Sequence, residues 1–298
     1  MTLEGVCDLC PRKCGVDRSV KKGYCSVGDT LKLGAATLHF WEEPILASKG
    51  GSGAVFFSGC SLKCVYCQNF ALSRGEGTEI SVKRLAEIFK ELEDKGADNI
   101  DLVTGSHFIP EIAEALRLYK PRVPVVFNCG GYEKVESLEL LKGLIDIYMP
   151  DFKYADKELA ARYSNAPDYP EVAVKAINEM KRQVGETVVG DDGLMKKGIL
   201  VRHLVLPNAV ANSKRALDIL SGVLDKQKDY ISLMSQYVPF GRAEEYPEIN
   251  RRLKPVEYKA VVAHAEKLGF KNAFIQLADS ADTDYIPDFD GRGVLKKD

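Results

Sequence analysis

Residues 58–70 read SGCSLKCVYCQNF and place Cys60, Cys64 and Cys67, separated by three and two residues, directly after an apolar segment. Thiolates are soft ligands that suit zinc or iron–sulfur clusters. A structural zinc site needs a fourth ligand close by, and no Cys or His follows before His107. A 4Fe-4S cluster held by three cysteines leaves one iron open. The stretch is interpreted as such a cluster site, with a three-ligand zinc site or buried thiols as alternatives.

The composition is that of a soluble globular protein of 298 residues, with 45% hydrophobic and 28% charged residues. A net charge of −2 offers no basic field for nucleic acid or an anionic membrane, so neither is expected as a partner. The first residues lack the apolar core of a signal peptide, and no apolar run approaches the ~20 residues of a membrane span. We expect a cytoplasmic location, where the eight cysteines favour metal binding over disulfides.

The chain divides into two predicted regions. Residues 1–52, rich in Gly, Lys and Cys, predict a small four-cysteine metal-binding lobe, which a glycine-rich hinge at 50–53 joins to a main domain, 53–298. In the main domain, apolar segments alternate with amphipathic ones. Strands are predicted at 53–59, 99–104, 123–128, 145–153, 199–207 and 230–237, with a hairpin at 188–198 and a last strand at 273–278.

A helix is predicted after each of the six main strands. The helix at 81–95 has Ser81 as its N-cap, Pro110 opens the next, and the others lie near 138–144, 172–184, 213–225 and 255–268. Six such β-α units predict an α/β fold with a parallel sheet. The ligand site of such a sheet lies at the carboxyl ends of its strands.

The pattern C-x3-C-x-aromatic-C, formed by Cys60, Cys64, Tyr66 and Cys67, resembles the hallmark of the radical S-adenosylmethionine (radical SAM) superfamily. The resemblance implies a partial (β/α)6 barrel of TIM type, here with a small N-terminal Cys-rich lobe. It also implies a 4Fe-4S cluster on the three cysteines, whose open iron chelates SAM. Reductive cleavage of SAM then gives a 5′-deoxyadenosyl radical that abstracts a hydrogen atom. Tyr66 would flank the adenine of SAM.

Residues at the ends of the other predicted strands stand where the superfamily contacts SAM. Gly105 and Ser106 follow the second strand at the place of a Gly-Gly-Glu motif, whose glutamate is missing here. Asp151 and Lys153 match a D-x-K motif, and because they are two residues apart on an extended segment, their side chains point the same way. The resemblance also implies a SAM contact from Asn128, because its neighbour Phe127 stands at the superfamily's aspartate position. It implies that His203 or Arg202 contacts the SAM carboxylate, and that Gln236 contacts SAM as well.

The likeness extends to pyruvate formate-lyase activating enzymes. Gln68 and Asn69 resemble the continuation of their cluster motif, and the N-terminal CDLCPRKCG segment is similar to that of activating enzyme-like proteins. This resemblance implies that the chain installs a glycyl radical on a partner protein, with an electron donor such as flavodoxin or ferredoxin. Two alternatives stay open: radical modification of a small molecule or peptide, and a non-catalytic iron–sulfur or zinc binding protein.

Cys7, Cys10, Cys14 and Cys25 form a second, complete set of four thiols. A closed zinc site would stabilise a lobe too small to have its own core, whereas an auxiliary 4Fe-4S cluster could relay electrons or bind substrate. The spacing of the cysteines does not distinguish a zinc site from an iron–sulfur cluster. A metal with a structural role is slightly favoured over an auxiliary cluster. Cys129 is expected to be a packed or SAM-adjacent thiol rather than a cluster ligand.

Residues 39–44, HFWEEP, precede the predicted hinge and combine a histidine, two aromatic residues and two acids. If the small lobe folds over the mouth of the barrel, Trp41 and Glu42 or Glu43 face the substrate. The alternative interpretation is an aromatic contact between domains, flanked by solvated acids.

Overall fold

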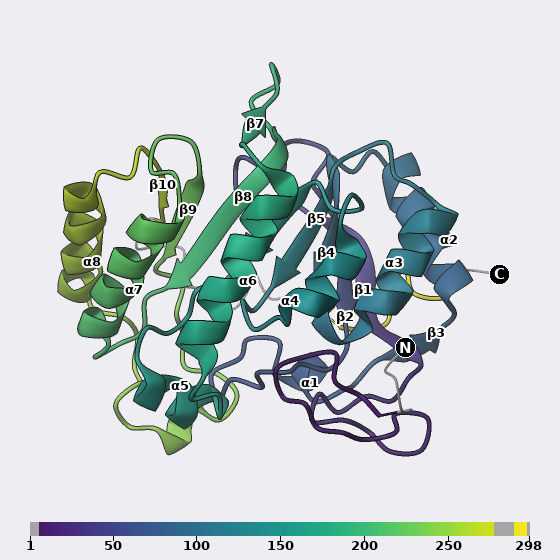
Figure 1. The fold of residues 1–298 in the computed structure, drawn as a ribbon, viewed down its shortest axis with the longest axis horizontal. Coiled ribbons are helices and arrows are strands. Elements are labelled where there is room, and N and C mark those ends of the chain that lie inside the picture. The colour runs from purple at the N-terminus through teal and green to yellow at the C-terminus, as the bar shows by residue number, and fades with distance from the viewer. Residues whose placement is uncertain (1–5, 277–288, 297–298) are drawn as a thin grey trace.

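Six apolar segments form neighbouring parallel strands of one curved sheet (Figure 1). The structure, a computed structural model, describes residues 6–276 and 289–296. The six strands are β2 (Ser52–Phe57), β4 (Asn99–Val103), β5 (Val125–Cys129), β6 (Ile147–Pro150), β8 (Met195–Leu204) and β9 (Tyr230–Met234). The last predicted strand corresponds to β10 (Asn272–Ile275), parallel to β9; residues 277 and 278 of that prediction lie outside the described residues.

Antiparallel strands complete the sheet. β1 (Leu31–His39) pairs with both β2 and β3 (Thr78–Ile80), and β7 (Val188–Val189) forms the predicted hairpin with β8. Residues 31–39 lie in the predicted N-terminal lobe, yet they are hydrogen-bonded into the main sheet. The order is β10-β9-β8-β6-β5-β4-β2-β1-β3, and among the described residues its two ends do not pair. The predicted α/β fold with an unclosed, partial barrel is therefore confirmed.

Helices pack against the outer face of the sheet (Figure 1). The longer ones are α2 (Val82–Asp94), α3 (Ile109–Leu118), α5 (Lys157–Ser164), α6 (Tyr169–Val184), α7 (Val210–Val223) and α8 (Pro255–Leu268). Short ones are α1 (Phe70–Ser73), α4 (Val135–Leu138) and the 3-10 turns Ser106–Phe108, Glu139–Leu141 and Ala243–Glu245. No helix in the described ranges is both long and apolar enough to cross a membrane.

Helix ends follow the predicted signals in part. The Ser81 side chain accepts a hydrogen bond of 3.1 Å from the Arg84 N–H and caps α2 as predicted. The helix predicted near 138–144 is wrong in length: α4 passes into a 3-10 turn that ends at Leu141. The chain then turns at Gly143, whose φ of +78° does not continue a helix.

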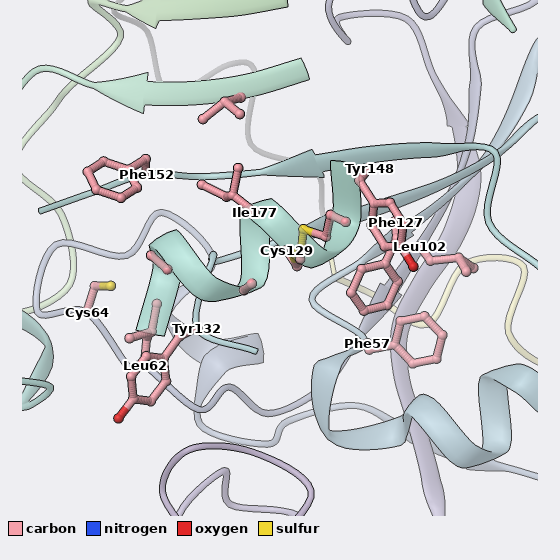
Figure 2. Packing of buried hydrophobic residues seen from close by; sticks show 14 of the residues in the cluster. Phe57, Leu62, Cys64, Leu102, Phe127, Cys129, Tyr132, Tyr148, Phe152 and Ile177 are labelled. Carbon is pink, nitrogen blue, oxygen red and sulfur yellow. The ribbon is translucent and has the colours of Figure 1, made fainter. Parts of the chain in front are cut away.

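Alternation along the strands separates a packed face from a face that lines a cavity. Phe57, Leu102, Phe127 and Tyr148 are fully buried in the hydrophobic cluster that joins the sheet to its helices (Figure 2). Since successive side chains of a strand point to opposite faces, the residues next to them face the interior of the partial barrel. Phe127, at the superfamily's aspartate position, therefore belongs to the core.

Candidate functional site

A cavity of about 620 Å³ lies on the inner face of the sheet. Most of the side chains predicted to bind the cofactors line it: Cys60, Cys64, Tyr66, Cys67, Asn128, Asp151, Lys153 and Gln236. These residues come from the loop after β2 and from the carboxyl ends of β5, β6 and β9, where a parallel sheet is expected to bind its ligand. The lining also includes Thr104, Cys129 and Arg202.

The three thiols of the loop after β2 stand on one wall of this cavity. Burial raises the pKa of Cys60, and it raises that of Cys67 to about 12, while the nearby Lys153 ammonium acts in the opposite direction on both thiols. Soft metals displace the proton of a buried thiol and bind the thiolate. Within the described ranges, no three His, Cys, Asp or Glu side chains are arranged to hold a single metal ion. By donor chemistry, three soft sulfurs beside an ammonium fit an anionic iron–sulfur cluster.

A chain of hydrogen bonds leads from Tyr66 to Cys64. The hydroxyls of Tyr66 and Tyr154 are 2.7 Å apart, and the Tyr154 hydroxyl is 2.8 Å from Ser164 Oγ. Ser164 Oγ donates to Cys64 Sγ at 3.0 Å. The Tyr66 side chain is thus buried in a network that holds Cys64, while the residue still lines the cavity.

Asp151, Lys153 and Arg202 form a charged network at the ends of β6 and β8. Lys153 pairs with Asp151 Oδ2, and Arg202 Nε donates to Asp151 Oδ1 at 3.0 Å. Arg202 Nη2 also donates to Asn128 Oδ1 at 2.7 Å. Burial tends to raise the pKa of Asp151, but the charges of Lys153 and Arg202 hold it below its usual value. The network presents fixed positive charge to a carboxylate and fixed negative charge to an amine or hydroxyl.

His203, Gly105 and Ser106 lie outside the cavity wall, unlike the other predicted contacts. Arg202 faces the cavity, so alternation turns His203 to the other face of β8. There His203 Nδ1 is 2.6 Å from the Phe152 carbonyl oxygen, and burial lowers the pKa of the ring to about 4. In the structure, therefore, the His203 side chain does not reach the cavity where SAM contact was predicted. The alternative residue, Arg202, does line the cavity.

Glu133 is a buried acid that the sequence analysis missed. Ser106 Oγ donates to Glu133 Oε1 at 2.7 Å, and Cys129 Sγ donates to Oε2 at 3.2 Å. Burial raises the pKa of Glu133 to about 7. Through these two bonds the Glu133 carboxyl links the ends of β4 and β5 behind the cavity wall. The Ser106 hydroxyl is therefore already bonded within the protein.

Residues 39–44 reach the cavity from the amino ends of the parallel strands. β1 ends at His39, which pairs with Ser52, the first residue of β2. His39, Trp41, Glu42, Glu43 and Pro44 all line the cavity, and the following Ile45 and Leu46 pack against inward residues of β5 and β6. Trp41 and the two glutamates thus lie on the cavity wall, but not because a lobe folds over the carboxyl-terminal mouth.

The four N-terminal cysteines lie on residues 6–30, which form turns and bends rather than helices or strands. A β-carbon placed on Gly23 would be 3.3 Å from Cys25 Sγ and 3.5 Å from Cys14 Sγ, so two of the sulfurs flank this glycine. Burial raises the pKa of Cys10 to about 12 and raises that of Cys25 as well. The loop contains the predicted set of thiols, two of them buried.

Arg12 fastens this loop to the three-cysteine loop. Its Nε donates to the Ser61 carbonyl at 2.7 Å, and its Nη2 donates to the Ser164 carbonyl at 2.7 Å. The guanidinium also stacks over the Tyr24 and Tyr132 rings, at 4.2 and 5.1 Å from their centroids. The two cysteine-bearing segments are therefore neighbours in space.

Comparison with known proteins gives one sequence family and a set of distant structural neighbours. The profile of the radical SAM superfamily matches residues 54–194. An uncharacterized protein of Methanocaldococcus jannaschii is 31% identical over 273 residues, which cover 88% of this chain and 74% of that protein.

The solved structure of Streptococcus suis SuiB bound to precursor peptide SuiA has a TM-score of 0.50 at 13% identity, over 73% of this chain and 46% of SuiB. Methylornithine synthase has a TM-score of 0.47 at 14% identity, over 72% and 68% of the two chains. The present chain thus spans less than half the length of SuiB, and that likeness concerns the fold alone.

Proposed function

This chain belongs to the radical SAM superfamily, and on that premise we propose that it cleaves SAM reductively to a 5′-deoxyadenosyl radical, which abstracts a hydrogen atom from a substrate. The 4Fe-4S cluster implied by the family, once reduced by an electron donor, would supply the electron for this cleavage. The observation that carries the proposal is the wall of three thiols, Cys60, Cys64 and Cys67, facing the same cavity as the charged network of β6 and β8.

The residues that line the cavity would have the following roles. The three thiolates would hold the cluster. Lys153 and Arg202 would attract the carboxylate of the SAM amino-acid tail, and Asp151 would accept hydrogen bonds from its amine or from the ribose hydroxyls. The remaining polar contacts to SAM would come from Tyr66, Asn128 and Gln236, all of which line the cavity.

For the N-terminal cysteines we propose a second metal site, structural in role. Residues 6–30 have little regular structure, and a metal would supply the cross-links that such a loop lacks. Zinc and a 4Fe-4S cluster use the same four thiolates. Elemental analysis separates them, because zinc would give about one zinc and four irons per chain, and a second cluster about eight irons.

The finer activity proposed is activation of a glycyl radical enzyme in the cytoplasm, with flavodoxin or ferredoxin as electron donor. It is supported by the D-x-K pair and by the cysteine motif with its Gln68–Asn69 continuation. A second candidate is radical modification of a small molecule or peptide, which is favoured by the missing Gly-Gly-Glu glutamate and by Phe127 in place of an aspartate. A non-catalytic metal protein is the candidate from another class.

One set of anaerobic assays tests these proposals. The reconstituted full chain receives dithionite and SAM, and 5′-deoxyadenosine is quantified with and without added partner. A glycyl radical signal in electron spin resonance supports the activating role, whereas a modified small product without that signal supports the second candidate. Absence of 5′-deoxyadenosine from protein with a full complement of iron would leave the non-catalytic candidate.

A further inference from the structure

Three carboxyl groups gather at the end of the cavity away from the cysteines. Glu42 and Glu43 line this end, and Asp101 of β4 lies behind them on the inner face of the sheet. Glu43 is 8% exposed and Asp101 is 1% exposed. Charge from Glu42 contributes to raising the pKa of both carboxyls, after burial itself, and the pKa of Glu43 reaches about 7. Glu42 therefore acts electrostatically on each of the other two acids.

The positive groups of the cavity are already shared among several partners. Lys153 pairs with Asp151. Arg202 bonds to Asp151 at 3.0 Å and to Asn128 at 2.7 Å, and it reaches Glu42 only at 3.5 Å. With Asp101, the cavity region holds four acids, Glu42, Glu43, Asp101 and Asp151, against the two cations Lys153 and Arg202.

Asp101 gives an independent indication that a donor is needed here. Its Oδ2 accepts a hydrogen bond of 3.2 Å from Asn128 Nδ2. Its Oδ1 is buried and receives no hydrogen bond from a donor among the described residues, and the Asp101 carboxyl meets the Glu42 carboxyl, which is another acceptor. A buried carboxyl oxygen without a partner is costly, and a cationic donor would satisfy it.

This acidic end is separate from the end that carries the cysteines. Asp101 pairs with Ala54 in the sheet, and Cys60 lies six residues beyond Ala54 along the chain. The three residues from Ala54 to Phe57 alone advance about 10 Å along β2, at roughly 3.3 Å per residue. His39 and Trp41 line the cavity near this end, since His39 pairs with Ser52 at the start of β2.

We propose that Glu42, Glu43 and Asp101 form a subsite for an ammonium or guanidinium group of the substrate. The proposal rests on the proposed function, since it assigns the cysteine end of the same cavity to the cluster and SAM. Trp41 and Phe274 also line the cavity, and their aromatic side chains suit an alkylammonium group.

The test uses the reconstituted full chain at pH 8, saturated with SAM, and n-butylammonium as the probe. Binding is followed by saturation-transfer NMR, with neutral butyramide as the matched compound. Butylammonium is expected to bind and butyramide is not. Glu43→Gln should weaken butylammonium binding by about tenfold or more, and Glu111→Gln, which changes a half-buried acid outside the cavity wall, should leave it unchanged.

A replacement variant and parallel measurements of SAM binding and cleavage serve as controls. If Glu43→Gln fails to fold, Asp101→Asn replaces it and should give the same loss. Equal binding of butylammonium and butyramide, or butylammonium binding indifferent to both substitutions, would overturn the subsite. A parallel loss of SAM affinity would also overturn it, because the acids would then serve the ammonium group of SAM. SAM cleavage is assayed in the same samples: its absence alongside retained butylammonium binding would remove the proposed function and leave the cation subsite standing.

Discussion

The backbone N–H of Cys60 donates a hydrogen bond of 3.2 Å to the backbone carbonyl of Cys25, which joins the two cysteine sets. Gly59 makes this approach possible: it has a φ of +89°, and a β-carbon there would lie 2.6 Å from the Cys25 carbonyl oxygen. The N-terminal loop is thus hydrogen-bonded directly to the loop that carries Cys60, Cys64 and Cys67.

Cys10→Ala is expected to remove the N-terminal metal, either one zinc or about four irons per chain. The melting temperature should fall as well, because metal binding contributes folding free energy to a loop without regular structure. Elemental analysis and calorimetry measure the two effects. Cys129→Ala, which removes a buried thiol outside both sets, should keep the full metal content. Unchanged metal in Cys10→Ala would contradict the second site.

Asp151→Ala should lower the free energy of unfolding by about 3–5 kcal/mol, because it leaves the largely buried charges of Lys153 and Arg202 without their shared carboxylate. The affinity for SAM should fall with it. Urea denaturation and equilibrium dialysis measure the two quantities. The matched control is Asp94→Ala, which breaks an exposed pair with Lys90 and should cost only about 0.3–0.5 kcal/mol. Similar small costs for both variants would show that the network is not a buried ion pair in solution.

Ser164→Ala should shift the reduction potential of the cluster to a more negative value. The Ser164 hydroxyl donates to Cys64 Sγ, and such a bond stabilises the extra negative charge of the reduced cluster. A redox titration followed by electron spin resonance measures the shift. Ser213→Ala is the control, since Ser213 is equally buried and its Oγ has no hydrogen-bond partner within the described ranges. Identical potentials in the two variants would place the cluster elsewhere.

Glu133 should make stability fall as the pH rises from about 4.5 to about 7. Below this window the carboxyl is protonated in both states; within it, the unfolded carboxyl ionises while the buried one, with its pKa raised to about 7 by burial, keeps its proton. The unfolded state therefore binds fewer protons and gains relative stability, by roughly 3 kcal/mol across the window.

Denaturation of wild type and Glu133→Gln at pH 5 and pH 8 measures this effect. The variant should lose less stability than wild type between the two pH values, because it has no carboxyl to ionise at this position. Parallel losses in the two proteins would mean that Glu133 ionises in the folded state as it does in water.

Local signals in the sequence were sufficient for much of the fold. The cap at Ser81 and the helix 255–268 have short-range causes, a side-chain acceptor in one case and an initial proline with a closing glycine in the other. The pairing of β1 with the main sheet has no such local signal. It depends on residues 40–51 bringing β2 back alongside β1, and no short-range pattern in the sequence specifies that return.

The site was predictable where residues stand in a motif. Asp151 and Lys153 share a face because they are two residues apart, and they form the ion pair that this spacing allows. The choice between Arg202 and His203 needed the orientation of β8, which neighbouring strands set. Glu133 and Asp101 belong to no motif, and their roles depend on β4 and β5 lying side by side.

The most direct measurement is the yield of 5′-deoxyadenosine from anaerobically reconstituted full chain, compared with Cys64→Ala, in the presence of dithionite and SAM. The account predicts that wild type forms 5′-deoxyadenosine and that Cys64→Ala, with the N-terminal cysteines intact, forms none above the protein-free background. Equal yields from the two proteins, or no yield from wild type loaded with its full iron, would contradict the assignment of Cys60, Cys64 and Cys67 to a SAM-cleaving cluster.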